Sequence, residues 1–364
     1  MTIGIDISML NYQGSGVANY TFNLVKNLLK YDKKDDYRLF YSSLRRPKNF
    51  YYLKELKKIG ADIFELSLPI TFLETAWGRL NIIEPELFIG KVDVFVASDY
   101  LRPPTFKGTR VVTTVHDLIW KIFPEYHEER IIRAHEKKLA KTIKYNDSII
   151  ADSKNTKKDL LKYYPKVKEK NVHVIYPGIG EQYKKMSSSK YPGNFVLYAG
   201  AVEPRKNLET AIRVFHDLVT FRAKSRKPYA DFKFLIAGRG GWKNENILPL
   251  IKKLGLKKKI KFMGYVAEKD LPYLYSAAKV FMFLSLYEGF GLPPLETAAC
   301  GTPTLLYANS SLKEIFKPGY PYTKKGKELE TLKKLIDEKP NVKKFMYDFS
   351  WKNYCAEFLK IIAS

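Results

Sequence analysis

Short apolar runs alternate with helix-like patterns along the first half of the chain. Residues 3–7, 37–41, 110–115 and 148–151 are rich in apolar side chains, as is typical of buried strands. Between the first two runs, apolar residues recur at helical spacing from Val17 to Leu29. This alternation predicts a parallel α/β sheet flanked by helices.

A second series of the same kind begins after a Pro-Gly break at residues 177–178. Residues 195–199, 232–237 and 280–284 are strand-like, and a turn and a helical pattern follow each. Residues 179–189, which end in three serines, resemble a linker. The last residues form an amphipathic helical pattern. The sequence therefore predicts two α/β domains.

Composition agrees with this organisation. With 364 residues, 45% of them hydrophobic, the chain is long enough for two domains. No apolar run approaches the roughly 18 residues that a membrane-spanning helix needs. Residues 2–6 follow a strand pattern rather than that of a signal peptide, so we expect a cytoplasmic protein. Cys300 and Cys355 are too few for a disulfide framework and lack a metal-ligand spacing.

The formal charge of +25 favours an anionic partner, such as nucleic acid, an anionic membrane or a phosphorylated substrate. A solvated basic surface explains it equally well, because the lysines are spread over most predicted helices. Residues 45–58 interleave basic and aromatic side chains, as in a helix that lies on anionic lipid. The alternative is a helix with its apolar side in the core and its lysines in water.

The candidate chemistry centres on residues 285–296, where Glu288 and Glu296 flank a predicted turn from strand to helix. Gly289 and Gly291 lack a Cβ and let a ligand approach the backbone, and the helix that follows offers unpaired amides to an anion. A nucleotide sugar fits this arrangement. A purely structural turn explains the same residues equally well.

Three further features flank predicted strands. Arg205 and Lys206 follow a strand and precede a helix, where two cations and free amides make a diphosphate site; the alternative is an exposed surface turn. His116 ends the strand 110–115, at the sheet edge where α/β proteins bind ligands, although a lone histidine is often structural. Gly16 belongs to a glycine loop after the first strand.

The run 285–296 closely resembles the glutamate-x7-glutamate signature of retaining glycosyltransferases of family four. The resemblance extends over residues 3–30, 110–178, 195–316 and 349–362. It departs at residues 317–320, where a small acidic turn is expected. It implies the α/β GT-B fold, in which two Rossmann-like domains with parallel sheets face each other across a cleft, and the C-terminal helix crosses back to the N-terminal domain.

The resemblance also implies a division of labour between the domains. Residues 1–178 with 347–364 form an acceptor-binding domain, and residues 179–346 bind the nucleotide-sugar donor. It implies that Glu288 contacts the donor sugar, Glu296 the ribose, Arg205 and Lys206 the diphosphate, and His116 the sugar or acceptor. Glu288, His116, Arg205 and Lys206 are thus the expected catalytic residues. The expected donor-binding residues are Gly16, Gly200, Arg205, Lys206, Tyr265, Val266, Glu288, Gly289, Phe290, Gly291, Leu292 and Glu296. Arg130, Arg133 and His135, on one predicted helix, are further candidate acceptor contacts.

The implied reaction moves a hexose, from a donor of the GDP-mannose or UDP-glucose type, to a hydroxyl of a glycan, glycolipid or lipid-linked saccharide, with retained configuration. We expect no cofactor and no required metal, because the basic pair can neutralise the diphosphate and no Asp-x-Asp motif lies in a suitable loop. An anionic membrane surface, contacted peripherally, is an expected partner, and nucleic acid is not. The rival interpretations are a glycoside hydrolase and a basic nucleic-acid-binding protein.

Overall fold

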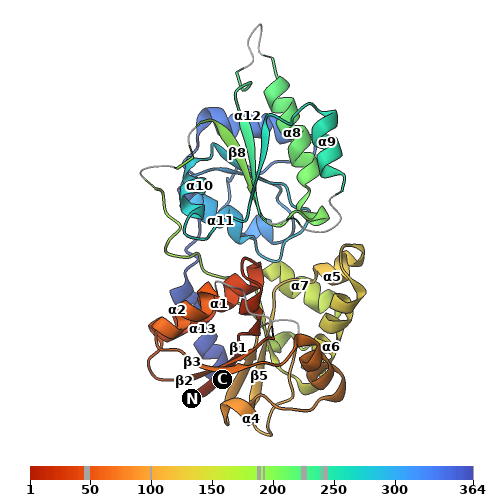
Figure 1. The fold of residues 1–364 in the computed structure, drawn as a ribbon, viewed down its shortest axis with the longest axis vertical. Helices are drawn as coiled ribbons and strands as arrows, with labels where there is room; N and C mark the ends of the chain where they lie inside the picture. Colours follow the sequence, from red (N-terminus) through yellow and green to blue (C-terminus); the bar gives the residue numbers. More distant parts are fainter. Residues whose placement is uncertain are drawn as a thin grey trace. The chain divides into compact units, whose positions relative to one another are not determined.

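The computed structural model describes residues 1–44, 50–98, 101–186, 190–191, 193–222, 228–238, 240 and 245–363. The chain forms two compact units (Figure 1). The first consists of Met1–Gly178 together with Phe349–Ser364, and the second of Ile179–Asp348. Each unit is an α/β layer structure around one parallel sheet, which confirms the predicted fold class.

The sheet of the first unit has seven parallel strands in the order β3-β2-β1-β4-β5-β6-β7. The central strand β1 carries the apolar side chains Ile3 and Ile5, and both are fully buried. The strand order reverses at β1, and α/β sheets bind ligands beside the carboxyl ends of the strands at such a point. The strands are β1 Thr2–Asp6, β2 Asp36–Ser42, β3 Asp62–Leu66, β4 Val94–Ala97, β5 Arg110–Val115, β6 Ser148–Ala151 and β7 Val172–Val174.

Helices connect these strands. They are α1 Gly16–Tyr31, α2 Tyr51–Lys58, α3 Ile70–Thr75, α4 Glu86–Ile89, α5 Ile119–Ile122, α6 Glu129–Tyr145, α7 Lys154–Tyr163 and α13 Trp351–Ala363. Short helical turns are η1 Ser8–Asn11, the π-helical η2 Ala76–Leu80, η3 Pro124–Tyr126 and η4 Glu169–Asn171. Helix α3 continues directly into η2, which ends at the left-handed Asn81 (φ 55°), and α4 begins after Pro85.

Helix α13 belongs to the core of the first unit although it ends the chain. Its residues Tyr354 and Phe358 are buried in the cluster that also contains Tyr20 of α1, and the Tyr20 and Tyr354 hydroxyls are hydrogen-bonded. The chain leaves this unit at Gly178, where a Cβ would lie 2.2 Å from the backbone nitrogen of Trp351. Only glycine fits this close approach of the departing and returning segments.

Helix α2 tests part of the lipid interpretation of residues 45–58. Tyr52 and Leu56 are buried in the core, whereas Lys54 and Lys57 are exposed. The described part of this stretch therefore favours a helix that packs its apolar side on the sheet. Arg45–Asn49 lie outside the described residues, so a membrane contact there stays a prediction.

The second unit has five parallel strands in the order β10-β9-β8-β11-β12. They are β8 Phe195–Ala199, β9 Lys233–Ala237, β10 Ile260–Gly264, β11 Val280–Phe283 and β12 Thr304–Leu306. Its helices are α8 Leu208–Thr220, α9 Ile247–Lys253, α10 Leu271–Ala277, α11 Leu292–Ala299 and α12 Glu328–Glu338, with the short turns η5 Pro204–Lys206, η6 Ser310–Glu314 and η7 Val342–Phe345. Helix α8 contacts α9 and α12, and α10 contacts α11 (Figure 1). The serines of the predicted linker, 187–189, lie outside the described residues.

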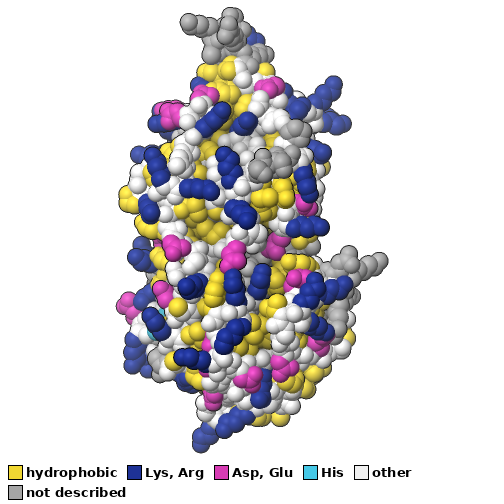
Figure 2. All heavy atoms as spheres, turned by 90° about the vertical axis from the view of Figure 1, so that its left-hand side faces the viewer, with side chains coloured by type: hydrophobic (Ala, Val, Ile, Leu, Met, Phe, Trp, Pro, Cys, Tyr) yellow, Lys and Arg dark blue, Asp and Glu magenta, His cyan; other side chains and the backbone are white. Residues whose placement is uncertain are grey.

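The surface is basic without a single dominant patch on the face that Figure 2 shows. Lysine and arginine side chains are scattered there among apolar and acidic ones (Figure 2). Within the described residues, no helix combines the length and apolar character needed to cross a membrane. The spread of the lysines agrees with the solvated-surface interpretation of the charge.

Candidate functional site

The loop between β11 and α11 carries the first candidate glutamate. Gly291 caps α11 with a φ of 108°, and a Cβ there would lie 2.7 Å from Cδ2 of Leu312. Both facts require glycine, because L side chains rarely adopt this backbone region. The backbone conformation of the loop where it enters α11 is therefore fixed by Gly291.

Side chains from the turn η6 hold this loop in place. Ser310 Oγ accepts a hydrogen bond from the Glu288 amide (3.0 Å), and Ser311 Oγ donates to the carbonyl oxygens of Glu288 (2.8 Å) and Phe290 (2.9 Å). Asn309 Nδ2 donates to the carbonyl oxygen of Ser285 at 3.0 Å. These bonds satisfy loop groups that have no partner in a helix or strand.

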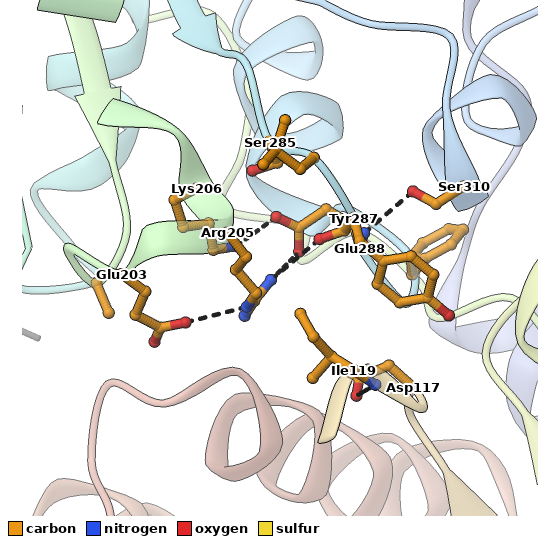
Figure 3. Close-up of polar contacts among 12 residues, drawn as sticks. Asp117, Ile119, Glu203, Arg205, Lys206, Ser285, Tyr287, Glu288 and Ser310 are labelled. Atoms are coloured by element: carbon orange, nitrogen blue, oxygen red, sulfur yellow. Dashed lines mark hydrogen bonds and ion pairs between the residues drawn. The ribbon is translucent and has the colours of Figure 1, made fainter. Parts of the chain in front are cut away.

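The side chain of Glu288 lies between two cations, as Figure 3 shows. Its Oε1 accepts from Lys206 Nζ (2.6 Å) and its Oε2 from Arg205 Nη1 (2.9 Å). Arg205 Nε also donates to Glu203 Oε2 at 3.0 Å. We call Glu203, Arg205, Lys206 and Glu288 the ion cluster. The basic pair is thus not a solvated surface turn, and Lys206 is only 9% exposed.

The ion cluster fixes the charge of its members. Burial opposes ionisation of Glu288, but the neighbouring Lys206 and Arg205 outweigh it and lower its pKa to about 2. Burial and the charge of Arg205 lower the pKa of Lys206, and Glu288 acts against both. Glu288 is therefore a carboxylate at neutral pH and accepts hydrogen bonds.

Glu296 has the opposite environment, eight residues further along the chain. It is 6% exposed, and Tyr275 Oη donates to its Oε2 at 3.3 Å. Burial and the charge of Glu268 raise its pKa to about 8, although hydrogen bonds from Tyr183 and Tyr275 act in the other direction. In the described conformation Glu296 carries a proton at neutral pH.

The start of helix α11 offers fewer amides than expected. Its first turn contains Pro293 and Pro294, which have no N–H, so of the first helical positions Leu292 and Leu295 alone carry a backbone donor. This corrects the expectation of an amide-rich helix end. The charged hydrogen-bond donors of this region are Arg205 and Lys206 instead.

Both ring nitrogens of His116 are held within the first unit. Nδ1 lies 2.7 Å from Asp152 Oδ2, and Nε2 lies 3.0 Å from the carbonyl oxygen of Ser98. A carbonyl oxygen accepts hydrogen bonds, so Nε2 carries a hydrogen, while Nδ1 faces a carboxyl group. Burial raises the pKa of Asp152. Tyr20 packs edge-on against the imidazole at 4.6 Å. His116 is therefore oriented by two partners, and its role toward a substrate stays a prediction.

The remaining expected donor residues lie on both units. Gly16 begins α1 in the first unit. Gly200 follows β8 with a φ of 144°. A Cβ added to Gly238 would lie only 2.0 Å from the carbonyl oxygen of Gly200, so the two glycines are in close contact. Tyr265 is half exposed just after β10, in the second unit. Val266, Gly289 and Leu292 also belong to that unit.

The three candidate acceptor contacts of helix α6 differ in their environment. His135 stacks on Trp120 at 5.0 Å, and burial lowers its pKa to about 3, so it is a neutral packing residue. Arg130 is exposed and donates to Glu74 at 2.8 Å, and Arg133 pairs with Glu129. Within the described residues, no group of three acidic, cysteine or histidine side chains could hold a metal ion.

Sequence reasoning missed the partners of both glutamates. Glu203 completes the ion cluster, while Tyr183 and Tyr275 contact or approach Glu296. Glu203 lies in the predicted turn, two residues before Arg205, and an acidic residue that close to an arginine indicates a possible ion pair. Tyr183 and Tyr275 gave none, because they reach Glu296 from distant parts of the chain.

Two family models match the chain. "Glycosyltransferase Family 4" matches residues 14–182, and "Glycosyl transferases group 1" matches residues 179–339. Together they span both structural units.

Curated relatives share part of this region. O-antigen chain mannosyltransferase B of Escherichia coli is 29% identical over 215 residues, which are 57% of this chain and 55% of the relative. Mannosylfructose-phosphate synthase of Agrobacterium fabrum is 30% identical over 161 residues, 40% of this chain and 34% of that protein. The similarity thus spans about half the length of these relatives, or less.

Solved structures match over the whole chain. HepE of Anabaena, in complex with UDP and glucose, superposes with a TM-score of 0.71 at 15% identity and covers 100% of this chain and 99% of its own. Sucrose-phosphate synthase of Thermosynechococcus elongatus gives a TM-score of 0.70 at 16% identity, with 100% and 98% covered. At this identity the likeness establishes the fold, which is the predicted GT-B fold.

The raised pKa of Glu296 predicts a pH-dependent stability. Its ordinary value is 4.5 and its value here about 8, so the folded protein holds a proton that the unfolded chain releases. The stabilisation is complete below the lower value and is lost as pH rises toward the upper one, at about 1.4 kcal/mol per pH unit. Glu296→Gln should therefore gain stability relative to the parent over this range, measured by urea unfolding. A constant difference between the two proteins would contradict the assignment.

Proposed function

This chain belongs to the glycosyltransferases described by these two family models, and we propose that it transfers a hexose from a nucleoside-diphosphate sugar to an acceptor hydroxyl with retention of configuration. The ion cluster carries this proposal. It holds Arg205 and Lys206 within hydrogen-bond distance of the ionised Glu288, with Glu203 also bonded to Arg205, in the turns that precede α8 and α11. A diphosphate and a sugar require those two kinds of partner.

The cations suit the leaving group. When the bond between sugar and phosphate breaks, negative charge develops on the diphosphate, and fixed donors at that place lower the barrier. Arg205 and Lys206 supply charge-assisted donors, each bond being worth about 1.5 to 3 kcal/mol. An ammonium group has three N–H donors, and Nζ of Lys206 donates one of them to Glu288 in this structure. It can therefore bind phosphate while it keeps this pair.

Glu288 suits the sugar. A carboxylate offers about four acceptor positions, and the two cations use two of them. Sugar hydroxyls can donate to the others. The protonated Glu296 adds a group that both donates to and accepts from a ribose hydroxyl, rather than the acceptor carboxylate expected from the sequence.

The comparisons favour a nucleotide-sugar donor. The similar HepE structure holds UDP and glucose, and the curated relatives include mannosyltransferases and a synthase of mannosylfructose phosphate. We propose UDP- and GDP-hexoses as the donors to test first. For the acceptor we propose a hydroxyl of a glycan, glycolipid or lipid-linked saccharide. Retention then follows from attack on the face of the sugar that the leaving phosphate occupies, with that phosphate taking the acceptor proton.

Two rival functions fit the structure less well. A glycoside hydrolase uses two carboxyl groups across the glycosidic bond and needs no cationic group, whereas the carboxylate of Glu288 is paired with both Arg205 and Lys206. A nucleic-acid-binding protein gathers its basic residues on one face or stripe, whereas the face in Figure 2 scatters them. The cytoplasmic location and the peripheral membrane contact stay predictions.

The basic pair provides the first test of this function. Arg205→Ala should lower turnover of the nucleotide sugar by at least about tenfold, because it removes one charge-assisted donor worth more than 1.4 kcal/mol. Slow hydrolysis of UDP- and GDP-sugars without acceptor measures this loss. Arg213→Ala is the matched control, since Arg213 is an exposed arginine on α8. Equal turnover in the two folded variants would remove Arg205 from the donor site.

The same cations predict a reaction without a required divalent metal. Arg205 and Lys206 can together neutralise the charge that a metal otherwise balances on a diphosphate. Treatment with EDTA followed by desalting should leave the rate of donor hydrolysis unchanged. A loss of activity that magnesium or manganese restores would refute this expectation.

A further inference from the structure

A basic cavity lies in the first unit, built from residues that the proposed donor chemistry does not use. Its volume is about 440 Å³, within the range of small-molecule sites. The turn η2, the segment 101–102 and one side of helix α6 line it. The donor cluster belongs to the other unit, so the cavity is a separate feature.

The lining of this cavity is strongly cationic. Seven lysine and arginine side chains line it, against two glutamates among the described residues. Both glutamates, Glu74 and Glu129, are paired with arginines at the exposed rim. A concave surface with charges of one sign concentrates their potential, so the cavity attracts anions.

Two of the cations are built into the wall. Arg102 is 5% exposed and makes a two-pronged ion pair with Asp147, with both N–O distances 2.9 Å. Lys138 is also 5% exposed and donates to the carbonyl oxygen of Thr114 at 2.6 Å. A buried cation is costly unless an anion or strong acceptor compensates it, so both side chains are held in fixed positions, Arg102 by a carboxylate and Lys138 by a neutral carbonyl group.

Three further lining cations, Arg79, Lys137 and Lys141, have no carboxylate partner in the described part of the chain. Lys141 donates to the carbonyl oxygen of Trp77 and to Asn81 Oδ1 (2.8 Å), both neutral groups. Lys137 and Arg79 form no ion pair there either. Burial, followed by the charges of Arg102, Lys144 and Lys137, lowers the pKa of Lys141 to about 8. The cluster therefore repels itself in the absence of an anion.

We infer that this cavity binds a phosphate or diphosphate group. A single carboxylate would leave most of the charge unbalanced, whereas a diphosphate carries several charges and enough acceptor oxygens for arginine and lysine together. An extended nucleic acid would need a stripe of basic residues rather than one cavity of this size. The group can belong to a small soluble molecule or to the head of a lipid.

Calorimetric titration with inorganic pyrophosphate at constant ionic strength tests the inference. The double variant Lys137→Gln/Lys141→Gln should weaken the binding of pyrophosphate to the cavity by at least about tenfold, because two cations are lost from the cavity. The matched control is Lys158→Gln/Lys162→Gln, which removes the same charge from the exposed side of α7. Repeating each titration in Arg205→Ala separates the cavity from the donor cluster, so either proposal can fail alone. The single variant Lys137→Gln, at an exposed position, replaces the double variant if that one unfolds.

A second arm identifies the source of the group. Phosphatidylcholine vesicles, with and without a prenyl diphosphate, are sedimented with each variant. Binding that needs both the prenyl diphosphate and the cavity lysines supports a lipid head group, and pyrophosphate binding without vesicle binding supports a soluble ligand. Equal pyrophosphate affinity in the cavity and control variants would overturn the inference and mark the cations as a solvated cluster.

Discussion

The second unit depends on the pairing of Glu288 with Arg205 and Lys206. These residues are 82 and 83 positions apart in the sequence and come from the turns that follow β8 and β11, which are neighbours in the sheet. A buried carboxylate is costly alone, and two buried cations are costly without it. The pairing therefore locks two loops together and orients the cations before any ligand arrives. Ser310 and Ser311 fix the backbone on which the carboxylate stands.

The two glutamates of the signature, Glu288 and Glu296, differ in protonation state at neutral pH. Cations lower the pKa of Glu288 to about 2, whereas burial beside Glu268 raises that of Glu296 to about 8. Environment rather than residue type thus assigns one group to accept hydrogen bonds and the other to both donate and accept them.

The fold was largely predictable because buried parallel strands leave continuous apolar runs, as at residues 110–115 and 280–284. The sequence pattern does not show where a helical stretch is interrupted, as at the left-handed Asn81 and at Pro85, which precedes α4. The candidate glutamates and cations could be named from their place after strands. Their mutual pairing could not, because it depends on strand order in space. The prolines of α11 showed the missing amides in the sequence itself, and that signal was overlooked.

The most direct test of the donor site is a crystal structure of the protein with an intact nucleoside-diphosphate sugar. We expect diphosphate oxygens about 2.7 to 2.9 Å from nitrogen atoms of Arg205 and Lys206, with sugar hydroxyls donating to Glu288. A bound donor whose diphosphate lies away from both cations, with the ion cluster unchanged, would contradict it.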